Sequence, residues 1–400
     1  MALIVQKFGG SSVATADKMR HVASIIAAAK QQGNDMVVVV SAQGKTTDNL
    51  IEKAGEISAL APEREMDVLL ATGEQASAAL LAMALREAGE AAVSLLGWQA
   101  GFKTDSSFTK AAIQTLDPVR VQKELQKGNI VVVAGFQGVD GEANITTLGR
   151  GGSDTSAVAL AAVLKADKCQ IYTDVEGVYT ADPRFVPGAQ KLEKISYDEM
   201  LELAALGAKV LNHRSVEMAK KYGVKIEVLS SMSLVPGTIV KEVLDMENLL
   251  VTGVAKDINV AAITLTGLPN TPGVASTIFE IMQKANISVD LITLARLEAE
   301  QAITFTVTAA DKPKALAVLE EGKQNIGYTH LLCDTQVAKV SVVGGGMQSR
   351  PGVAAAVFKA LGGHNINIQL ISTSEIKISV LVAKADADEA VAAIHGAFFP

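Results

Sequence analysis

The sequence predicts an α/β protein with a mostly parallel sheet covered by helices on both faces, followed by two ferredoxin-like βαββαβ units. Over roughly the first 245 residues, short β-branched runs alternate with Ala/Leu-rich helical stretches. Hydrophobic residues make up 49% of the chain and aromatic residues only 4%, which is typical of Val/Ile strands and Ala/Leu helices. The remainder of the chain repeats itself. A length of 400 residues accommodates two or three domains, each with its own core.

Six apolar runs are the strand candidates of the first part: ALIVQKF, MVVVVSA, AAVSLLG, NIVVVAGF, CQIYTDV and KIEVL. The spacing predicts helices between them, among them Asp17–Gln32 and Gln75–Ala88. Continuous apolar strands separated by helices indicate a parallel sheet buried on both faces. Ligands bind such sheets beyond the carboxyl ends of the strands, so the loops there are the first place to look for chemistry.

The C-terminal part contains an internal duplication. ITLTGLPNTPGVASTIFEIMQKANISVDLI (263–292) and VSVVGGGMQSRPGVAAAVFKALGGHNINIQLI (340–371) each combine a strand, a Pro-Gly turn, a helix and an Asn-Ile strand. A constant offset of 79 residues relates Pro272 to Pro351, Phe279 to Phe358 and Asn286 to Asn365. Each half adds a further strand and helix, which gives the order β-α-β-β-α-β twice.

Charge and cysteine content exclude several classes of protein. The net charge of -7 and the lack of Lys/Arg runs argue against nucleic-acid binding, so a polyanionic substrate needs local basic groups. Cys169 and Cys333 form no CxxC or zinc-type pattern, and we expect structural thiols in a reducing compartment. The start MALIVQKFGG lacks a basic signal-peptide region, and the longest apolar runs span about eight residues, which predicts a soluble cytoplasmic protein.

Two loops that follow predicted strands could bind anions. In ALIVQKFGGSSVATADKMRHV, Gly9 and Gly10 let backbone N–H groups converge on a phosphate, and Lys7 adds a mobile charge. The alternative is a plain strand-ending turn. VVVVSAQGKTTDNL resembles the second half of a Walker motif, but Val39 stands where the first glycine is required. Its polar residues either bind a small ligand or serve as turn and N-cap residues.

The stretch TTLGRGGSDTSAVALAAVL combines a glycine-rich turn with an apolar run that predicts a buried helix. Ser153 or Asp154 can cap a helix that begins near Thr155, but capping does not explain Arg150. An arginine beside a glycine turn can hold a carboxylate through two parallel hydrogen bonds, and Asp154 can orient a lysine or a magnesium-bound water. Ligand binding is therefore the favoured interpretation.

Three further segments have both a structural and a functional interpretation. IYTDVEGVYTADPR carries a tyrosine able to stack on a base and an arginine able to reach phosphates, or it is a surface hairpin. Glu74 in LLATGEQAS lies at or just before the start of a predicted helix, where it either suits the helix dipole or holds an ammonium group. His213 has no Ser or Cys partner that indicates a triad, and we expect it to be structural.

Taken together, KFGGSS, VVVVSAQGKTTDNL, LLATGEQAS, TTLGRGGSDTSA, YTDVEGVYTADPR and ALGAKVLNHRS closely resemble the aspartate kinases of the amino-acid-kinase family. TDVEGVYTADP is shared with glutamate 5-kinase and uridylate kinase relatives, whereas KFGGSS, SAQGKTTDNL and ALGAKVLNHRS discriminate. Gln43 stands where the family commonly has Met. The resemblance spans the chain and implies a three-layer αβα, carbamate-kinase-like catalytic domain over 1–245, followed by a regulatory region over 246–400 with tandem ACT domains.

The implied reaction moves the γ-phosphoryl of ATP to the β-carboxylate of L-aspartate, with Mg²⁺ bridging the phosphates through ligands that the sequence does not identify. This is the first step of lysine, threonine and methionine biosynthesis. The resemblance makes Lys7 and Asp154 the catalytic pair. The implied aspartate contacts are Ser41, Thr47, Glu74, Arg150, Gly151, Gly152 and Ser153. The implied nucleotide contacts are Lys7, Phe8, Gly9, Gly10, Ser11, Thr173, Asp174, Tyr179, Asp182, Arg184, Lys209 and Val210.

The ACT resemblance implies feedback inhibition by lysine, threonine or both, at units covering about 264–336 and about 248–263 plus 337–400. In this arrangement the first unit is inserted within the second. The implied effector contacts are Asn270, Thr271, Pro272, Gly273, Val274, Ala275, Ser288, Val289, Asp290, Asn365, Ile366, Asn367 and Ile368. Paired units imply a homodimer, or a heterotetramer with a regulatory subunit translated from a start near Met246.

Two rival functions remain at this point. One is a kinase of the same superfamily that acts on glutamate, N-acetylglutamate or UMP. The other is a non-catalytic amino-acid sensor, which the intact Lys7, Arg150 and Asp154 argue against.

Overall fold

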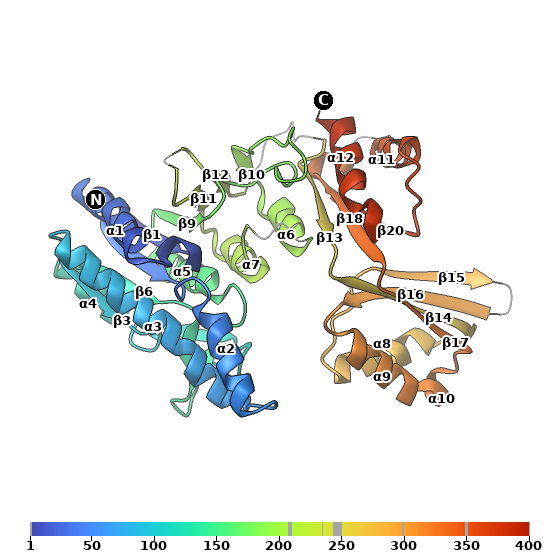
Figure 1. Cartoon of the computed structure of the whole chain (residues 1–400), viewed down its shortest axis with the longest axis horizontal. Coiled ribbons are helices and arrows are strands. Elements are labelled where there is room, and N and C mark those ends of the chain that lie inside the picture. Colours follow the sequence, from blue (N-terminus) through green and yellow to red (C-terminus); the bar gives the residue numbers. More distant parts are fainter. Residues whose placement is uncertain are drawn as a thin grey trace. The chain divides into compact units, whose positions relative to one another are not determined.

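The computed structural model describes residues 2–206, 210–233, 235–242, 250–297, 300–348 and 351–399. The chain divides into two compact units, which are described separately (Figure 1). The first unit comprises Met1–Val178, Lys191–Ala204 and Lys209–Leu244. The second unit comprises Tyr179–Gln190, Ala205–Ala208 and Asp245–Pro400.

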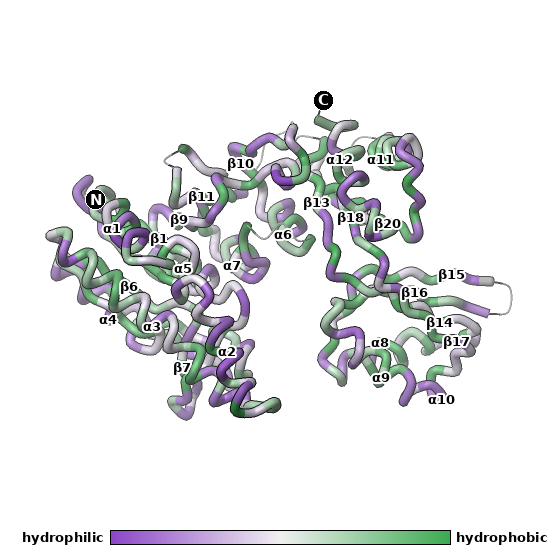
Figure 2. The backbone as a smooth tube through the Cα atoms, in the orientation of Figure 1, coloured by the Kyte–Doolittle hydropathy of each residue, from purple (hydrophilic) through white to green (hydrophobic). Residues whose placement is uncertain are grey.

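An eight-stranded sheet forms the centre of the first unit. Its strands, in spatial order, are β10 (Lys194–Ile195), β12 (Thr238–Val240), β11 (Ile226–Ser230), β9 (Lys168–Thr173), β1 (Leu3–Phe8), β2 (Asp35–Val40), β6 (Ile130–Ala134) and β3 (Ala92–Leu95). All neighbours are parallel except β11 and β12. Figure 2 shows the strongly apolar character of β6, as expected for a strand covered on both faces. All six predicted strands are present.

Side-chain alternation decides which helix meets each face of this sheet. Phe8 points to the same side as Val38 and Val40, into a core formed with α1 (Ala16–Gln31) and α3 (Glu63–Glu87). Alternate residues such as Lys7 face the opposite side, where α5 (Gly152–Leu164) packs on β1, β2 and β9. The first ten residues of α5 are buried, as its apolar sequence predicts.

The helix predicted over Gln75–Ala88 is longer than expected, because α3 begins at Glu63. Among the described residues, α3 alone is long and apolar enough to cross a membrane, and half of its most apolar window is buried in the protein. It packs on β2, β3, β6 and β8 (Ile145–Thr147), which identifies it as a core helix.

A second, four-stranded sheet of the first unit consists of strands too short for the sequence analysis to find. It contains β5 (Ile113–Leu116), β4 (Phe102–Thr104), β7 (Gln137–Val139) and β8. The remaining helices of this unit are η1 (Gly10–Val13), α2 (Thr46–Ile57), α4 (Val119–Gln126), α6 (Tyr197–Ala205) and α7 (His213–Tyr222).

The second unit contains two ferredoxin-like folds, of which the first runs in the order βαββαβ and the second, because its edge strand β13 comes first, in the order ββαββα. The first ACT unit consists of β14 (Val260–Pro269), α8 (Val274–Lys284), β15 (Ile292–Leu297), β16 (Glu300–Thr308), α9 (Lys312–Glu321), α10 (Lys323–Ile326) and β17 (His330–Asp334). The second ACT unit consists of β13 (Gly253–Asp257), β18 (Val337–Val343), η2 (Gly345–Gln348), α11 (Val353–Gly363), β19 (Leu370–Thr373), β20 (Lys377–Ala383), η3 (Lys384–Asp386) and α12 (Ala387–Phe398).

The two sheets have matching strand orders, β15-β16-β14-β17 and β19-β20-β18-β13. Strand β13, which precedes the first ACT unit in sequence, pairs antiparallel with β18 and occupies the edge position that β17 has in the other sheet. The duplication extends to the backbone, because Gly273 and Gly352 are both left-handed, as are Asn286 and Asn365. The boundary predicted at 245/246, together with Met246, lies outside the described residues.

Candidate active site

Four neighbouring strands of the large sheet end at one edge. Phe8 of β1 lies opposite Val40 of β2 and Tyr172 of β9, and Val40 lies opposite Ala134 of β6. Because these strands are parallel, the loops that follow them emerge together. Strand β1 is also the point where the order reverses, with β2 on one side and β9 on the other. The predicted catalytic loops therefore meet at the position where open α/β sheets bind ligands.

The Gly-Gly loop after β1 packs directly under the loop after β2. A side chain at Gly10 would bring its Cβ within 2.5 Å of the Ala42 carbonyl oxygen, and the Gly44 N–H donates to the Gly10 carbonyl at 3.0 Å. Only glycine fits this approach. A Cβ at Gly9 would lie 3.6 Å from the Lys7 Nζ, so backbone amides and ammonium are close together.

Lys7 and Asp154 form a buried ion pair. The Lys7 Nζ lies 2.7 Å from the Asp154 Oδ1, and the side chains are only 11% and 10% exposed. Both parts of this contact follow from the fold, since Lys7 faces α5 and Asp154 lies in the first turn of that helix. The capping interpretation is wrong, because α5 begins at Gly152 with the left-handed Gly151 as its N-cap residue. Asp154 instead fixes the position of a cation.

Side chains at the start of α7 hydrogen-bond to the backbone of the turn that carries Arg150. A Cβ at Gly151 would lie 2.3 Å from the Asn212 Nδ2, and Gly151 has φ 72°, so this position requires glycine. The Asn212 side chain donates to the Arg150 carbonyl at 2.9 Å, while its Oδ1 caps α7. Arg214 donates to the Leu148 carbonyl at 3.2 Å. The backbone of the turn is fixed, and the Arg150 side chain is exposed.

Asp67 is a buried carboxylate that the sequence analysis missed. It accepts from the N–H of Thr147 at 2.8 Å, the hydroxyl of Thr147 at 2.6 Å and the N–H of Thr109 at 2.9 Å. These bonds join α3 to β8, directly before the Arg150 turn, and burial raises the pKa of the Asp67 carboxyl. Asp67 and Glu74 are seven residues apart on the buried face of α3, whose other buried residues are apolar or small, and this spacing from Glu74 is the signal that could have identified Asp67.

Glu74 lies near the middle of α3, so a helix-dipole role does not account for it. The side chain is buried, with its Oε1 accepting from the Ala42 N–H at 3.0 Å. Its Oε2 has no hydrogen-bond partner within the described part of the chain. Burial raises the pKa of Glu74 to about 7, although the Ala42 hydrogen bond acts in the opposite direction. A buried, half-satisfied carboxylate indicates a ligand that carries a donor.

The remaining predicted aspartate contacts lie beside these groups. Ser41 is the first residue after β2 and donates its N–H to the Phe8 carbonyl at 3.2 Å. Thr47 is half-buried in the first turn of α2. Ser153 is buried, and its Cβ lies 2.9 Å from the place a Cβ would take at Gly135, the residue after β6. The structure thus gathers the loops after β1, β2 and β6 around the start of α5.

The predicted nucleotide segment divides between the two units. In the first unit, the Thr173 hydroxyl accepts from the Val175 N–H at 3.1 Å, and Asp174 is exposed. Tyr179, Asp182 and Arg184 belong to the second unit. There Asp182 and Arg184 form an ion pair of 2.6 Å, and hydrogen bonds from Arg184 lower the pKa of the Asp182 carboxyl.

Two other predicted nucleotide contacts follow α6. Val210 is half-buried. Lys209 lies outside the described residues.

The predicted effector residues form turns and strand edges of the ACT units. Asn270–Ala275 is an exposed turn that leads into α8, apart from the buried Val274. Ser288 and Asp290 are exposed on either side of the half-buried Val289, and Ile366 is the buried member of Asn365–Ile368. Asp290 also forms an ion pair with Lys339 of β18, which is itself buried.

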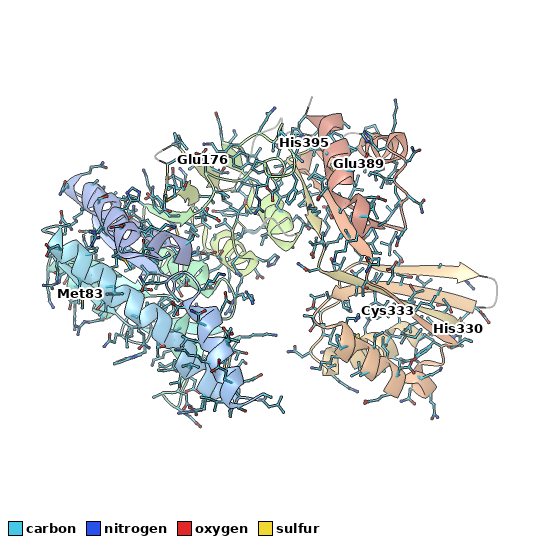
Figure 3. All side chains as sticks on the ribbon, viewed as in Figure 1. Met83, Glu176, His330, Cys333, Glu389 and His395 are labelled. Carbon is cyan, nitrogen blue, oxygen red and sulfur yellow. The ribbon has the colours of Figure 1, made fainter. Side chains whose placement is uncertain are left out.

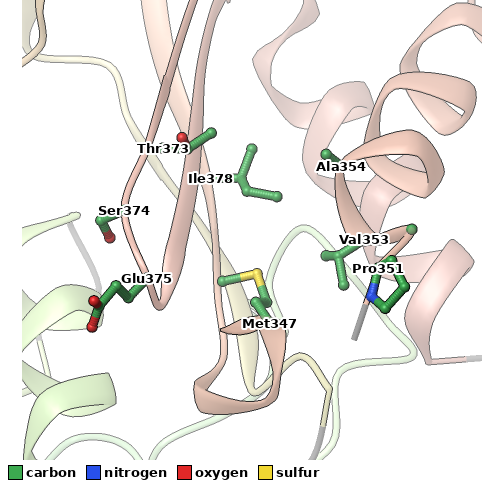
Figure 4. A pocket seen from close by; sticks show the side chains of 9 residues that line it. Met347, Pro351, Val353, Ala354, Thr373, Ser374, Glu375 and Ile378 are labelled. Carbon is green, nitrogen blue, oxygen red and sulfur yellow. The ribbon is translucent and has the colours of Figure 1, made fainter. Parts of the chain in front are cut away.

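The second ACT unit has a cavity of about 600 Å³ next to its Pro-Gly turn (Figure 4). Figure 4 shows the Met347 and Ile378 side chains between the β-hairpin and the start of α11. The lining residues are Met347, Pro351, Gly352, Val353, Ala354, Thr373, Ser374, Glu375 and Ile378. The cavity contains none of the predicted effector contacts, although its turn is the repeat partner of Pro272–Gly273.

No group of three or more His, Cys, Asp or Glu side chains converges in the described ranges. Mg²⁺ is usually bound through one or two carboxylates together with substrate phosphates.

The chain matches known families over most of its length. A model described as the amino acid kinase family matches residues 2–230, and a model of the ACT domain matches 255–322 and 340–398. The aspartokinase of Bacillus sp. strain MGA3 is 52% identical over 400 residues, which cover 100% of this chain and 97% of the relative. Aspartokinase 2 of Bacillus subtilis strain 168 is 51% identical over 399 residues, covering 100% and 98%.

Solved structures of similar proteins show ligands. E. coli aspartokinase III in complex with aspartate and ADP, described as the R-state, is 27% identical with a TM-score of 0.86, and 100% of each chain is covered. The same enzyme in complex with lysine and aspartate, described as the T-state, is 28% identical with a TM-score of 0.77 and the same coverage.

Proposed function

Because this chain belongs to the aspartokinase family, we propose that it transfers the γ-phosphoryl group of ATP to the β-carboxylate of L-aspartate, giving 4-phospho-L-aspartate and ADP. The buried Lys7–Asp154 pair carries the proposal, because it fixes a cation beside a glycine-rich backbone loop at the switch point of the sheet. Bringing a carboxylate to a polyphosphate requires such a concentration of positive charge.

Phosphoryl transfer needs in-line positioning and charge neutralisation more than covalent help from the protein. In the proposed complex, Lys7 and the Gly9–Gly10 amides stabilise the transferring group, and Asp154 holds Lys7 in place. Magnesium supplies further neutralisation of the phosphate charge when it is bound with the nucleotide. Further ATP contacts are proposed for Thr173, Asp174, Tyr179, Asp182 and Arg184.

Substrate choice rests on the two ends of the amino acid. Arg150 grips the α-carboxylate through its guanidinium fork, and the unsatisfied Glu74 Oε2 accepts from the α-ammonium. Ser41, Thr47 and Ser153 supply hydrogen bonds. A UMP kinase does not need a buried carboxylate for an ammonium group, which favours an amino acid as the acceptor.

The acceptor is tested by ADP release with ATP and each candidate in turn, namely aspartate, glutamate, N-acetylglutamate and UMP. We expect turnover with aspartate, and a hydroxylamine trap should detect an acyl phosphate. Turnover with glutamate or UMP but none with aspartate would refute the proposal. Binding of ADP without turnover for any acceptor would identify the chain as an amino-acid sensor.

Control by a pathway end product is the second part of the proposal. Two ACT units and a T-state complex of a relative with lysine support inhibition by lysine, threonine or both at the predicted turn and strand edges. We further propose a homodimer formed through the ACT units, with a regulatory subunit translated from Met246 as the alternative. Both cysteines are free thiols, which fits a cytoplasmic enzyme of lysine, threonine and methionine synthesis.

A further inference from the structure

The segment Tyr179–Gln190 leaves the first unit between β9 and β10 and becomes part of the second unit. Two backbone hydrogen bonds close its base. The Leu192 N–H donates to the Val178 carbonyl at 2.9 Å, and the Thr180 N–H donates to the Gln190 carbonyl at 2.9 Å. The segment is therefore a closed loop with a defined shape, and it carries three of the proposed nucleotide contacts.

Thr180 ties this loop to the second ACT unit through two bonds. Its carbonyl accepts from the Val254 N–H of β13 at 2.8 Å. Its hydroxyl lies 2.8 Å from the Nε2 of His395 on α12, which Figure 3 labels, and also accepts from the Gln190 N–H at 2.9 Å. His395 is only 2% exposed and stacks on Phe399 with 4.7 Å between ring centroids.

The hydrogen-bond pattern is complete when His395 is neutral. The Thr180 hydroxyl accepts from Gln190 and can donate its single proton to the Nε2 of His395. Burial lowers the pKa of His395, which keeps the ring neutral and able to accept. The Thr180 hydroxyl and the neutral His395 ring therefore form a buried hydrogen bond with one donor and one acceptor.

Apolar packing anchors the same loop a second time. Ala181 and Val186 are 4% and 5% exposed and belong to the core of the second ACT unit. Phe185 lies under the ammonium of Lys256, 3.7 Å from the ring centroid, and Lys256 is paired with Asp388 of α12. These anchors lie on both sides of Asp182 and Arg184, so the orientation of those two groups depends on β13 and α12.

We propose that the second ACT unit positions the nucleotide contacts that belong to its own compact unit, Tyr179, Asp182 and Arg184, with His395 as a positioning residue that holds Thr180. The inference rests on the proposed nucleotide role of this segment. It means that a regulatory fold contributes to ATP binding even when no effector is present. A shift of β13 or α12 would change ATP affinity directly.

The test compares Thr180→Val, which keeps the shape of the side chain but removes the hydroxyl, with Thr180→Ser, which keeps the hydroxyl. We expect Thr180→Val to raise both the KM for ATP and the Kd for ADP, measured calorimetrically, by about 3- to 10-fold, as for one lost hydrogen bond. The KM for aspartate and the kcat should stay within about twofold of wild type, and Thr180→Ser should restore nucleotide affinity.

His395→Leu is the second variant and should weaken ADP binding in the same way. The matched control is His364→Leu, because His364 is a half-exposed histidine of the same ACT unit, paired with Glu389 at 3.1 Å. The inference would be overturned if the variants that fold, Thr180→Val, His395→Leu or both, bound ADP as tightly as wild type. It would also be overturned if kcat fell and the KM values for ATP and aspartate rose by the same factor. Failure of the wild-type enzyme to phosphorylate aspartate refutes the proposed function, while the ADP titrations still decide the positioning role.

Discussion

The two ACT units have the same fold but differ where they meet. The repeat offset relates Lys339 to Val260 and Asp290 to Gln369. Lys339 and Asp290 form an ion pair that crosses from one unit to the other. At the related place, Val260 instead joins an apolar cluster with Leu370. Duplication therefore preserved the backbone, while the junction acquired one polar side and one apolar side.

Their cores differ as well. The buried core residues of the first ACT unit lie between Ala261 and Tyr328, whereas those of the second include Ala181 and Val186 from the proposed nucleotide segment. The core of the second copy is thus completed by a segment that precedes both copies in the sequence and belongs to the same compact unit. This difference agrees with the nucleotide role proposed for that segment, since only the second copy packs against it.

The largest expected effect tests whether phosphoryl transfer depends on Lys7, which lies outside both ACT units. Lys7→Ala should lower kcat by about 100-fold or more, since it removes the buried cation that faces the transferring group. Initial rates of ADP release measure the change. Lys30→Ala is the control, because Lys30 forms a more exposed pair with Asp35 at 3.5 Å. A near-normal rate for Lys7→Ala would mean that the catalytic cation lies elsewhere.

The next effect concerns Glu74, whose pKa of about 7 implies pH-dependent substrate binding. Only the ionised carboxylate pairs with an ammonium group, so kcat/KM for aspartate should fall about tenfold per pH unit below pH 7. In Glu74→Gln this slope should disappear and the KM for aspartate should rise by about 10-fold or more. Glu87→Gln, at an exposed position of the same helix, should behave as wild type.

Raising the pH should strengthen aspartate binding by Glu74 but lower the stability of the folded protein. Glu74 has an ordinary pKa of 4.5 when unfolded and about 7 when folded, so the folded state loses stability as pH rises through that interval. At pH 8 Glu74→Gln should therefore have a free energy of unfolding higher than wild type by on the order of 2 kcal/mol, and a higher melting temperature, whereas at pH 4 the two proteins should have the same stability. A higher melting temperature at pH 4 but not at pH 8 would contradict the assigned pKa.

The parts of this site that sequence predicted are those with a local signal. The strand that carries Lys7, the glycine turns and the duplication could all be predicted, because a few adjacent residues specify each of them. The roles of Asp67, Asn212 and Arg214 could not be predicted, because their hydrogen-bond partners are distant in sequence. These contacts arise only when α3 and α7 pack against the rest of the unit.

The start of α3 was missed for a related reason. Its first turns are rich in charged residues and carry little apolar periodicity, so propensity alone placed the start after Glu74. Burial of Asp67 and Glu74 is a property of the assembled sheet. The assignment of Tyr179–Gln190 to the second unit likewise depends on tertiary packing that no local pattern encodes.

A smaller effect is expected at the polar side of the junction. Lys339 is buried and neutralises Asp290, which is one of the predicted effector contacts, so the internal ammonium competes with an effector ammonium for the same carboxylate. Lys339→Met should therefore lower the concentration of lysine or threonine needed for half-inhibition by about 3- to 10-fold. Lys384→Met, at an exposed position in η3 of the same ACT unit, is the control. Weaker inhibition in Lys339→Met would show that the pair supports the effector site.

The smallest expected effect tests whether the left-handed turns of the two ACT units are energetically equivalent. Asn286 and Asn365 have φ 53° and 56°, a conformation that an alanine adopts at a cost of about 1 kcal/mol. Asn286→Ala and Asn365→Ala should therefore destabilise the protein equally, as measured by urea unfolding, and Asn→Gly at either position should be nearly neutral. Both side chains are exposed, so packing does not obscure the comparison. A cost at only one position would mean that the left-handed turn is a constraint in that copy alone, and that the likeness of the repeats is inherited rather than maintained by stability.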